Sequence, residues 1–266
     1  TIRHSVFSAP PQWAVDSIKG YEGHTWAPDI IYYKGNYHLF YSCSAFGKNT
    51  SAIGHAYRRT LSPASDEPWT DTGAVIVSHA RDNFNAIDPN IVIDEEGNPW
   101  MTFGSFWGGI QLVRLTEDLT STLKPEKLYT ICTRQFEGAS DVPSRSVNSV
   151  EAPFIFKHGG YYYLFVSYDF CCRGLKSDYK VVVGRSTRVT GPYVDKDGRK
   201  LTRGGGSLVV DSNDEFVAIG HSAAYHFDGK DYFMAHGYSR SEDGASKLFF
   251  REMTWDEEGW PLVSAE

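Results

Sequence analysis

Four residues that can take part in chemistry occupy corresponding positions in a repeated stretch of this sequence. Trp26, Asp88, Glu151 and His221 each come just before an apolar, strand-like run. When two carboxylates share a cavity, the repulsion between them raises the pKa of one and leaves the other low, so one can donate a proton while the other stays ionised. Glycosidic bonds are cleaved by such a pair. These residue types therefore predict sugar hydrolysis, provided that the fold brings them together.

Each of the four residues has a simpler explanation when it is taken alone. An Asp before Pro, as at Asp88, is often a turn residue, and a Glu before a strand, as at Glu151, is often only an exposed charge. A single His or Trp, such as His221 or Trp26, is often part of a core. Because nothing structural requires acids at the same place in successive repeats, their equivalence favours a joint function.

Aromatic residues near these positions predict a surface for sugar rings. Trp26, Phe46, Phe106 and Trp107 offer flat apolar faces of fixed geometry. The alternative is that they fill the core of a sheet. For Phe106 and Trp107, which lie in a Gly-rich segment, the sequence leaves both explanations open.

The elements that must position these residues are β-hairpins. Each repeat has an apolar run, a turn with Gly, an aromatic-rich run and a third short run, and the four copies cover residues 28–56, 89–113, 153–184 and 223–250. The copies start roughly 60 to 70 residues apart, which is typical of repeat architectures. Four short antiparallel strands repeated around an axis form a β-propeller, whose innermost strands line a central channel. In that fold, equivalent strand ends would meet at one mouth of the channel.

Length and composition agree with one large all-β domain. The chain has 266 residues, is rich in Tyr, Phe and Trp, and carries a formal charge of −7. This mildly acidic balance argues against nucleic acid or an anionic membrane surface as a partner, and it leaves neutral ligands such as sugars open. No apolar run is long enough to span a bilayer.

The cysteines leave two explanations open. Cys43, Cys132, Cys171 and Cys172 match no zinc-binding spacing, because an adjacent pair is not a C-x-x-C motif. They can be buried thiols, as free cysteines often are. Alternatively, the neighbours Cys171 and Cys172 are joined to each other.

The first 25 residues contain no copy of the repeat. We expect them to be the remnant of a first blade, so that the domain 1–266 is a five-bladed propeller with most of that blade missing and blades that begin near residues 26, 87, 151 and 221. A complete four-bladed ring is the alternative. Residues 134–148 and 204–220 are rich in Gly, Ser and Asp, and we expect them to be loops.

Taken together, these segments resemble the endo-α-1,5-L-arabinanases of glycoside hydrolase family 43. The resemblance covers nearly the whole chain and rests on segments 24–30, 44–54, 85–89, 103–109, 151–154, 171–174, 184–186, 190–193 and 204–206. It implies a five-bladed propeller that binds arabinan or arabino-oligosaccharides and cleaves internal α-1,5-L-arabinofuranosidic bonds with inversion. It also implies a secreted or periplasmic protein; no leader sequence is visible, and a cytoplasmic location is the alternative.

The resemblance also implies roles for individual residues. Glu151 corresponds to the general acid, and Asp88 to the second acid that raises the pKa of the general acid and orients it. His221 corresponds to an imidazole near a calcium or sodium ion in the central channel, which is held mostly through water. The residues that correspond to contacts with arabinose units are Trp26, Phe46, Gly47, Asn85, Ser105 and Trp107.

One departure concerns the general base. The family carries it as an Asp in a His-Asp-Pro motif of the first blade, and this sequence contains no His-Asp-Pro. We expect this Asp about one repeat upstream of Thr1, in a first-blade segment that is cleaved off or supplied by another chain. The alternatives are an exo-arabinanase, a β-xylosidase or arabinofuranosidase of the same family, a catalytically inactive propeller that binds arabinan, and a propeller that serves only as a protein scaffold.

Overall fold

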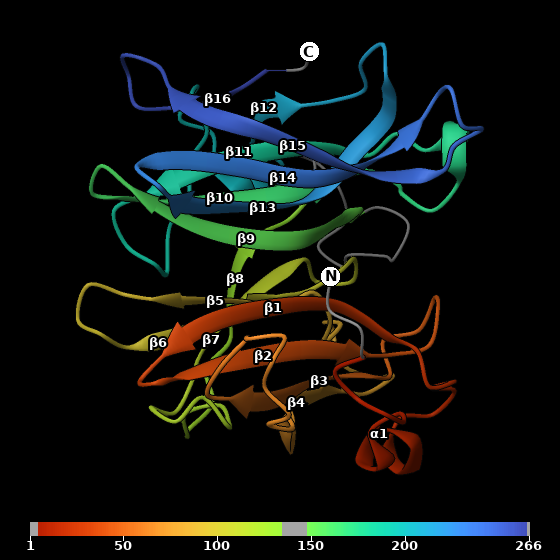
Figure 1. The fold of residues 1–266 in the computed structure, drawn as a ribbon. Coiled ribbons are helices and arrows are strands. Elements are labelled where there is room, and N and C mark those ends of the chain that lie inside the picture. The colour runs from red at the N-terminus through yellow and green to blue at the C-terminus, as the bar shows by residue number, and fades with distance from the viewer. Residues whose placement is uncertain (1–4, 135–147, 265–266) are drawn as a thin grey trace. The chain divides into compact units, whose positions relative to one another are not determined.

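The computed structural model describes residues 5–134 and 148–264. The strands of the described residues form four sheets of four strands each, and strands that are neighbours in the chain are also neighbours in the sheet. Figure 1 shows each sheet as a set of adjacent arrows that follow the chain in colour. Sheets of this up-and-down order are the blades that the repeat predicted.

The first two sheets come from the N-terminal half of the chain. The first sheet consists of β1 (Thr25–Tyr33), β2 (Asn36–Cys43), β3 (Ser51–Arg58) and β4 (Thr70–Ser78). The second sheet consists of β5 (Asn90–Ile93), β6 (Pro99–Phe103), β7 (Ile110–Arg114) and β8 (Tyr129–Cys132). A short helix, α1 (Gln12–Ser17), precedes them; the repeat pattern did not predict it.

The other two sheets come from the C-terminal half. The third sheet consists of β9 (Val150–His158), β10 (Tyr161–Tyr168), β11 (Lys180–Ser186) and β12 (Ser207–Val210). The fourth sheet consists of β13 (Phe216–Phe227), β14 (Lys230–Ser239), β15 (Ser246–Trp255) and β16 (Pro261–Val263). Two short 3-10 helices, η1 (Gly174–Lys176) and η2 (Leu201–Arg203), lie in the connections of the third sheet.

Tight turns with a left-handed backbone set the register of the hairpins. Lys34 (φ 46°) and Gly35 (φ 89°) connect β1 to β2, and Asp228 (φ 51°) and Gly229 (φ 75°) connect β13 to β14. Two successive residues with positive φ are the pattern of a type I′ turn, whose twist matches that of the strands it joins. The predicted Gly turns are therefore the turns that fix the strand pairing.

The chain divides into two compact units, each with its own core. The first unit comprises Thr1–Ser105 and Gln111–Tyr129. Its main core contains Phe40, Ile53 and Met101. In a second cluster of this unit, Ala14 and Ile18, in and just after α1, pack against side chains of β2 and β3. The segment around α1 thus covers part of the first sheet.

The second unit comprises Phe106–Ile110 and Thr130–Glu266. Its core is built from aromatic and β-branched side chains of the third and fourth sheets, whose fully buried members include Phe165, Val181, Phe233 and Phe249. Burial of such side chains is the main favourable contribution to folding.

Two details differ from expectation or fall outside the described residues. The segment 204–220, predicted as a loop, contains β12 and the start of β13, because its Val and Phe residues pair with neighbouring strands despite the Gly and Ser around them. Most of the other predicted loop, residues 135–147, lies outside the described residues. Within the described part of the chain, no helix is both long and apolar enough to cross a membrane.

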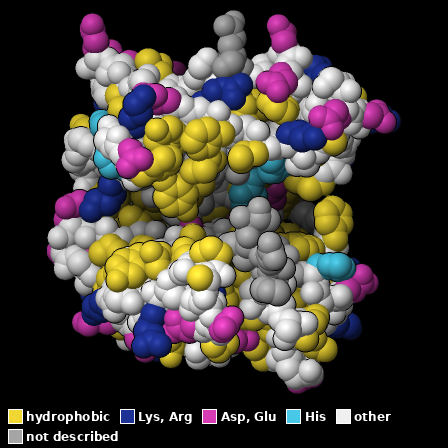
Figure 2. All heavy atoms as spheres, viewed as in Figure 1, with side chains coloured by type: hydrophobic (Ala, Val, Ile, Leu, Met, Phe, Trp, Pro, Cys, Tyr) yellow, Lys and Arg dark blue, Asp and Glu magenta, His cyan; other side chains and the backbone are white. Residues whose placement is uncertain are grey.

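Some hydrophobic side chains remain on the surface of the fourth sheet. Leu248, Phe250 and Leu262 are exposed. The ring of Tyr232 stacks on Phe227 with centroids 4.1 Å apart and on Phe250 with centroids 5.2 Å apart. Figure 2 shows hydrophobic side chains gathered over this part of the structure. A large exposed apolar patch commonly marks a surface that another element covers.

Candidate active site

Glu151 lies near the start of β9, where the strand departs from regular pairing. Its Cα is opposite Ser167 of β10, and the register of the two strands shifts between Phe165 and Ser167. The next residue, Ala152, has a left-handed backbone with φ 55°. Irregularities of this kind re-aim side chains and recur beside active sites. The carboxylate of Glu151 is half-buried, so it combines a fixed position with access to a ligand.

The hydroxyl of Tyr179 holds the Glu151 carboxylate. It donates a hydrogen bond of 2.7 Å to Oε1 of Glu151, and the Tyr179 side chain is only 1% exposed. The ring lies directly against Gly220 of β13, where a Cβ would come within 2.0 Å of the ring. The absence of a side chain at Gly220 therefore gives Tyr179 the space from which it reaches the carboxylate.

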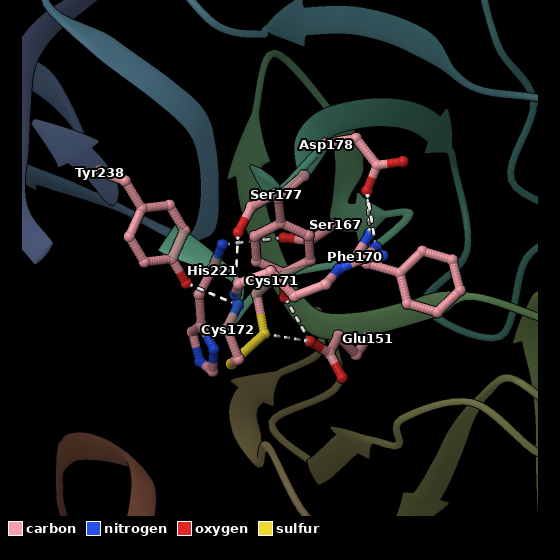
Figure 3. Close-up of a disulfide and its surroundings, with 11 residues drawn as sticks. Glu151, Ser167, Phe170, Cys171, Cys172, Ser177, Asp178, His221 and Tyr238 are labelled. Atoms are coloured by element: carbon pink, nitrogen blue, oxygen red, sulfur yellow. Dashed lines mark hydrogen bonds and ion pairs between the residues drawn. A yellow bond between two sulfur atoms is a disulfide. The ribbon is translucent and has the colours of Figure 1, made fainter. Parts of the chain in front are cut away.

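A disulfide lies on another side of the carboxylate. Cys171 and Cys172 are bonded to each other, and Sγ of Cys171 is 3.7 Å from Oε1 of Glu151 (Figure 3). Of the two explanations that the sequence left open, the bond between neighbours holds for this pair, and the buried thiol holds for Cys43 and Cys132.

His221 belongs to the same unit as Glu151. Its backbone is left-handed, with φ 52°, and its N–H donates a 2.8 Å hydrogen bond to Oγ of Ser167, the residue opposite Glu151 (Figure 3). Burial lowers the pKa of His221, and the charge of Glu151 opposes this shift. Both observations place His221 in the electrostatic environment of Glu151.

His236 of β14 adds a second imidazole beside His221. The two ring centroids are 6.3 Å apart. Burial, helped by the proximity of His221, lowers the pKa of His236 to about 4, so the ring is neutral near pH 7. Its buried Nδ1 has no hydrogen-bond partner among the described residues.

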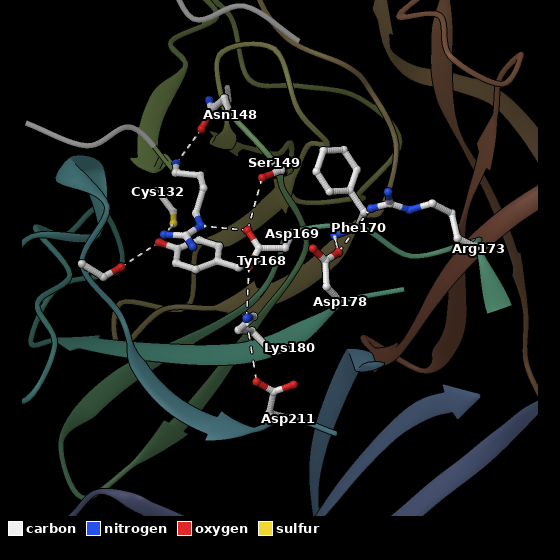
Figure 4. A network of polar contacts seen from close by, with 12 residues as sticks. Cys132, Asn148, Ser149, Tyr168, Asp169, Phe170, Arg173, Asp178, Lys180 and Asp211 are labelled. Atoms are coloured by element: carbon white, nitrogen blue, oxygen red, sulfur yellow. Dashed lines mark hydrogen bonds and ion pairs between the residues drawn. The ribbon is translucent and has the colours of Figure 1, made fainter. Parts of the chain in front are cut away.

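A network of charged side chains anchors the two strand ends next to Glu151 (Figure 4). Asp169, just after β10, forms ion pairs with Arg134 at 3.2 Å and with Lys180 at 3.2 Å. Its N–H donates to the carbonyl of Ser149, two residues before Glu151. These contacts are partly shielded from solvent, so they fix the backbone on either side of the carboxylate more firmly than surface ion pairs do.

In the first unit, Asp88 has the same local environment as His221 has in the second unit. Asp88 is buried and has a left-handed backbone with φ 58°. Its N–H donates a 3.0 Å hydrogen bond to Oγ of Ser42 in β2, as the N–H of His221 does to Ser167. In both copies of the repeat, a serine hydroxyl therefore accepts a hydrogen bond from the N–H of a residue with a left-handed backbone. In the copy that contains Glu151, the left-handed residue is the next one, Ala152.

Two further candidate residues, Asn85 and Ser105, belong to the same unit as Asp88. Asn85 is buried, and its Oδ1 accepts a 2.6 Å hydrogen bond from Ser51. Ser105, at the end of the segment after β6, is also buried. Asn85 therefore has a fixed side chain, which is a requirement for a residue that orients a ligand.

The candidate sugar-contact residues differ in exposure. Phe46 is 80% exposed and precedes Gly47, which has φ 74°, so the ring projects from a turn and is no part of a core. Trp26 is half-buried on β1. Trp107, in the second unit, is half-buried with φ 41°, and its carbonyl accepts a 2.8 Å hydrogen bond from Asn148.

Sequence reasoning found Glu151 and His221, which the structure brings into one electrostatic environment, but it missed Tyr179, Ser167 and Ser42. Tyr179 comes just before β11, and no other copy of the repeat has a Tyr at that place. The two serines do occupy equivalent positions near the end of the second strand of their copies, so a comparison of those strand ends would have found them.

Comparison with known proteins identifies the family of this chain. The family model described as "Glycosyl hydrolases family 43" matches residues 3–261. The chain is 48% identical to an extracellular exo-α-(1→5)-L-arabinofuranosidase of Cellvibrio japonicus over 97% of this chain and 75% of that protein. It is 40% identical to an extracellular endo-α-(1→5)-L-arabinanase of Bacillus subtilis over 98% of this chain and 75% of that protein.

The solved structures that this chain resembles include arabinanases as well. An α-L-arabinanase of Cellvibrio cellulosa is similar with a TM-score of 0.93 and 47% identity, over 98% of this chain and 84% of that one. An exo-1,5-α-L-arabinanase from a bovine ruminal metagenomic library is similar with a TM-score of 0.91 and 50% identity, over 98% and 84%.

This likeness confirms the predicted all-β propeller: the described residues form four blades, as expected for a five-bladed propeller without one blade. The family description matches nearly the whole chain, and relatives at 40% identity or above cover most of it. The chain therefore belongs to the arabinanases of glycosyl hydrolase family 43.

Proposed function

We propose that this chain is the catalytic propeller of an arabinanase that cleaves internal α-1,5-L-arabinofuranosidic bonds of arabinan with inversion. Glu151 is the general acid that protonates the leaving oxygen, while an activated water attacks the anomeric carbon from the opposite face. The observation that carries the proposal is the hydrogen bond from the buried Tyr179 hydroxyl to a half-buried Glu151. A carboxylate that is held in place and still accessible suits proton donation to a bound substrate.

Asp88 is proposed as the second acid, in the role that the family resemblance gives it. Its burial and its fixed backbone support a role that needs a defined position. The proposed contacts to arabinose units are Trp26, Phe46, Gly47, Asn85, Ser105 and Trp107. One relative, the Cellvibrio arabinanase, has been solved in complex with arabinohexaose, which supports arabino-oligosaccharides as ligands here.

The general base is proposed to be an Asp outside residues 1–266. The sequence lacks the His-Asp-Pro motif, and the chain spans 75% of the length of the Cellvibrio and Bacillus relatives. The exposed rings of Phe227 and Phe250, which both stack on the half-buried Tyr232, support a first-blade segment that docks on the fourth sheet. A chain extended at its N-terminus should gain at least about a hundredfold in turnover, the usual minimum for a general base, and should bind less of a hydrophobic dye.

An exo mode of action is the second candidate. Relatives with exo activity in their names are 48% and 50% identical to this chain, and a relative with endo activity in its name is 40% identical. The sizes of the products released early from linear arabinan distinguish the two modes. A ladder of oligomers supports endo action, and one short product from the first time point overturns it.

We infer that His221 lies beside a calcium or sodium ion that is held mostly through water. Within the described residues no group of three or more His, Cys, Asp or Glu side chains could hold a metal ion, so the inference rests on the family resemblance of His221. The unpartnered Nδ1 of His236 next to His221 marks the same polar region. Elemental analysis of protein dialysed without chelator should find about one ion per chain, and His221→Ala should lose it; equal ion content in both would contradict the inference.

Secretion is the proposed location. The support comes from the two relatives described as extracellular. Detection of the native protein in the culture medium, with a cytoplasmic marker retained in the cells, would test it.

A further inference from the structure

The Cys171–Cys172 disulfide lies at the start of a loop whose two ends are joined by hydrogen bonds. The loop connects β10 to β11, and its two sides are joined by hydrogen bonds between Phe170 and Asp178: the N–H of Phe170 donates to Oδ1 of Asp178 at 2.9 Å, and the N–H of Asp178 donates to the carbonyl of Phe170 at 3.1 Å. Tyr179, which binds Glu151, follows Asp178 directly. A change at the disulfide is therefore transmitted through the Phe170–Asp178 pair over a short distance to the residue that holds Glu151.

The disulfide is also fixed to the fourth sheet. The N–H of Cys172 donates a 2.7 Å hydrogen bond to the hydroxyl of Tyr238 in β14. Cys171 packs against a buried cluster that contains Tyr179 and Tyr238. The disulfide thus contacts both the cluster that contains Tyr179 and the hydroxyl of Tyr238 in β14.

The covalent state of Cys171 determines what Glu151 meets. With the bond closed, Sγ of Cys171 lies 3.7 Å from Oε1 and has no proton to donate. With the bond open, Cys171 is a thiol, a weak donor on a side chain that is no longer tied to Cys172, and it can compete with Tyr179 for Oε1. The ring also removes the rotamer freedom that two separate cysteines would have.

We propose that the Cys171–Cys172 disulfide is a positioning element for Glu151, so that opening it lowers kcat and leaves KM nearly unchanged. The proposal rests on the function proposed above for Glu151. Opening needs a dithiol reductant: the disulfide takes up two electrons and two protons to become two thiols, while the dithiol becomes a cyclic disulfide. Cys172 is exposed and Cys171 is half-buried, so a small dithiol can reach the bond, whereas Cys43 and Cys132 are buried free thiols.

Kinetics before and after treatment with dithiothreitol test the proposal. On N-terminally extended enzyme acting on arabinohexaose, we expect two new titratable thiols per chain, a drop in kcat of roughly five- to twentyfold, a KM within about twofold, and recovery after reoxidation. The double variant Cys171→Ser, Cys172→Ser is the matched control, because its low kcat should not respond to dithiothreitol. An unchanged kcat overturns the proposal, and so does a rise in KM alone, which would assign the disulfide to substrate contact.

A second readout does not depend on turnover. In protein labelled with ¹³C at the side-chain carboxyl of glutamate, the Glu151 signal is identified by its loss in Glu151→Gln. Reduction should shift or broaden this signal, and a signal that stays in place overturns the proposal. If the oxidised enzyme shows no turnover, the proposed function fails, yet the spectrum still decides whether the disulfide positions Glu151. Unchanged melting temperatures on reduction would exclude general unfolding as the cause.

Discussion

The hydroxyl of Tyr179 donates a 2.7 Å hydrogen bond to Oε1 of Glu151. Glu151 lies in β9, and Tyr179 lies in the loop just before β11 of the same blade. Because the Tyr179 side chain is only 1% exposed, its hydroxyl has a fixed position. Hydrogen bonds to charged groups contribute more than neutral ones, and fixed donors orient a carboxylate for proton transfer.

Tyr179→Phe should lower kcat by about 10- to 100-fold, the equivalent of a hydrogen bond to a charged group worth about 1.5 to 3 kcal/mol. KM should change by less than about twofold, since the ring and its packing stay. Steady-state kinetics on arabino-oligosaccharides measure both. Tyr163→Phe is the matched control, because Tyr163 donates to the carbonyl of Gly259 and has no contact with Glu151; it should lose stability and keep its kcat. Equal kcat values for both variants would contradict the role of Tyr179.

Gly220→Ala should displace the Tyr179 ring, because the new Cβ would lie 2.0 Å from it. We expect a lower kcat together with a loss of roughly 1 to 3 kcal/mol of stability, as in other overpacked sites. The comparison variant is Gly229→Ala, where φ is 75° but nothing lies within 4 Å of the added Cβ. It should cost only backbone strain and leave kcat unchanged. A Gly220→Ala enzyme with normal kcat would show that Tyr179 does not need this packing.

Asp88→Asn should reduce kcat by about 100-fold or more if Asp88 acts as the second acid, a typical value for removal of an acid–base group. The backbone contact from Asp88 to Ser42 does not involve the carboxylate, so the variant should fold with an unchanged circular dichroism spectrum. Activity within twofold of the parent would remove Asp88 from the mechanism.

The free energy of unfolding should decrease as the pH is lowered, because of His55. The fully buried ring of His55 is hydrogen-bonded to His38 at 2.9 Å and to Thr72 at 2.8 Å. Burial, with His38 nearby, lowers the pKa of His55 from 6.5 to about 4. The unfolded chain then binds more protons than the folded one between pH 6.5 and pH 4, so the free energy of unfolding is full above pH 6.5 and decreases as the pH falls through this window, by up to about 3 kcal/mol.

Urea denaturation at several pH values checks this expectation. His55→Gln lowers stability at every pH, but the decrease between pH 6.5 and pH 4.5 should become smaller than in the parent. Identical slopes for the two proteins would mean that His55 titrates normally in the folded state. The contribution of His55 to the free energy of unfolding should decrease as the pH is lowered through this range.

The sequence predicted the blades because each one carries its own local signals. The turn at Lys34 and Gly35 and the turn at Asp228 and Gly229 were visible because each contains a Gly, which tolerates positive φ. The acids stood out only because the repeat gave them equivalent positions. Tyr179 could not be found in this way, since its contact with Glu151 depends on the space at Gly220, which belongs to another blade.

The segment 204–220 shows why local composition can mislead. Its Gly, Ser and Asp residues predicted a loop, but Ser207–Val210 pairs with β11 and Phe216 begins β13. Pairing with a strand already in place outweighed local propensity. Similarly, sequence could offer a bond between Cys171 and Cys172 only as one of two explanations, because the state of a thiol depends on its surroundings.

The most direct test of the account is the dependence of Glu151→Ala on the leaving group, measured as kcat/KM on N-terminally extended enzyme. If Glu151 protonates the leaving oxygen, the variant should lose about a hundredfold or more on arabinohexaose and much less on a dinitrophenyl arabinoside, whose leaving group needs no proton. Equal losses on both substrates, or full activity on arabinohexaose, would contradict the assignment of Glu151 as the general acid.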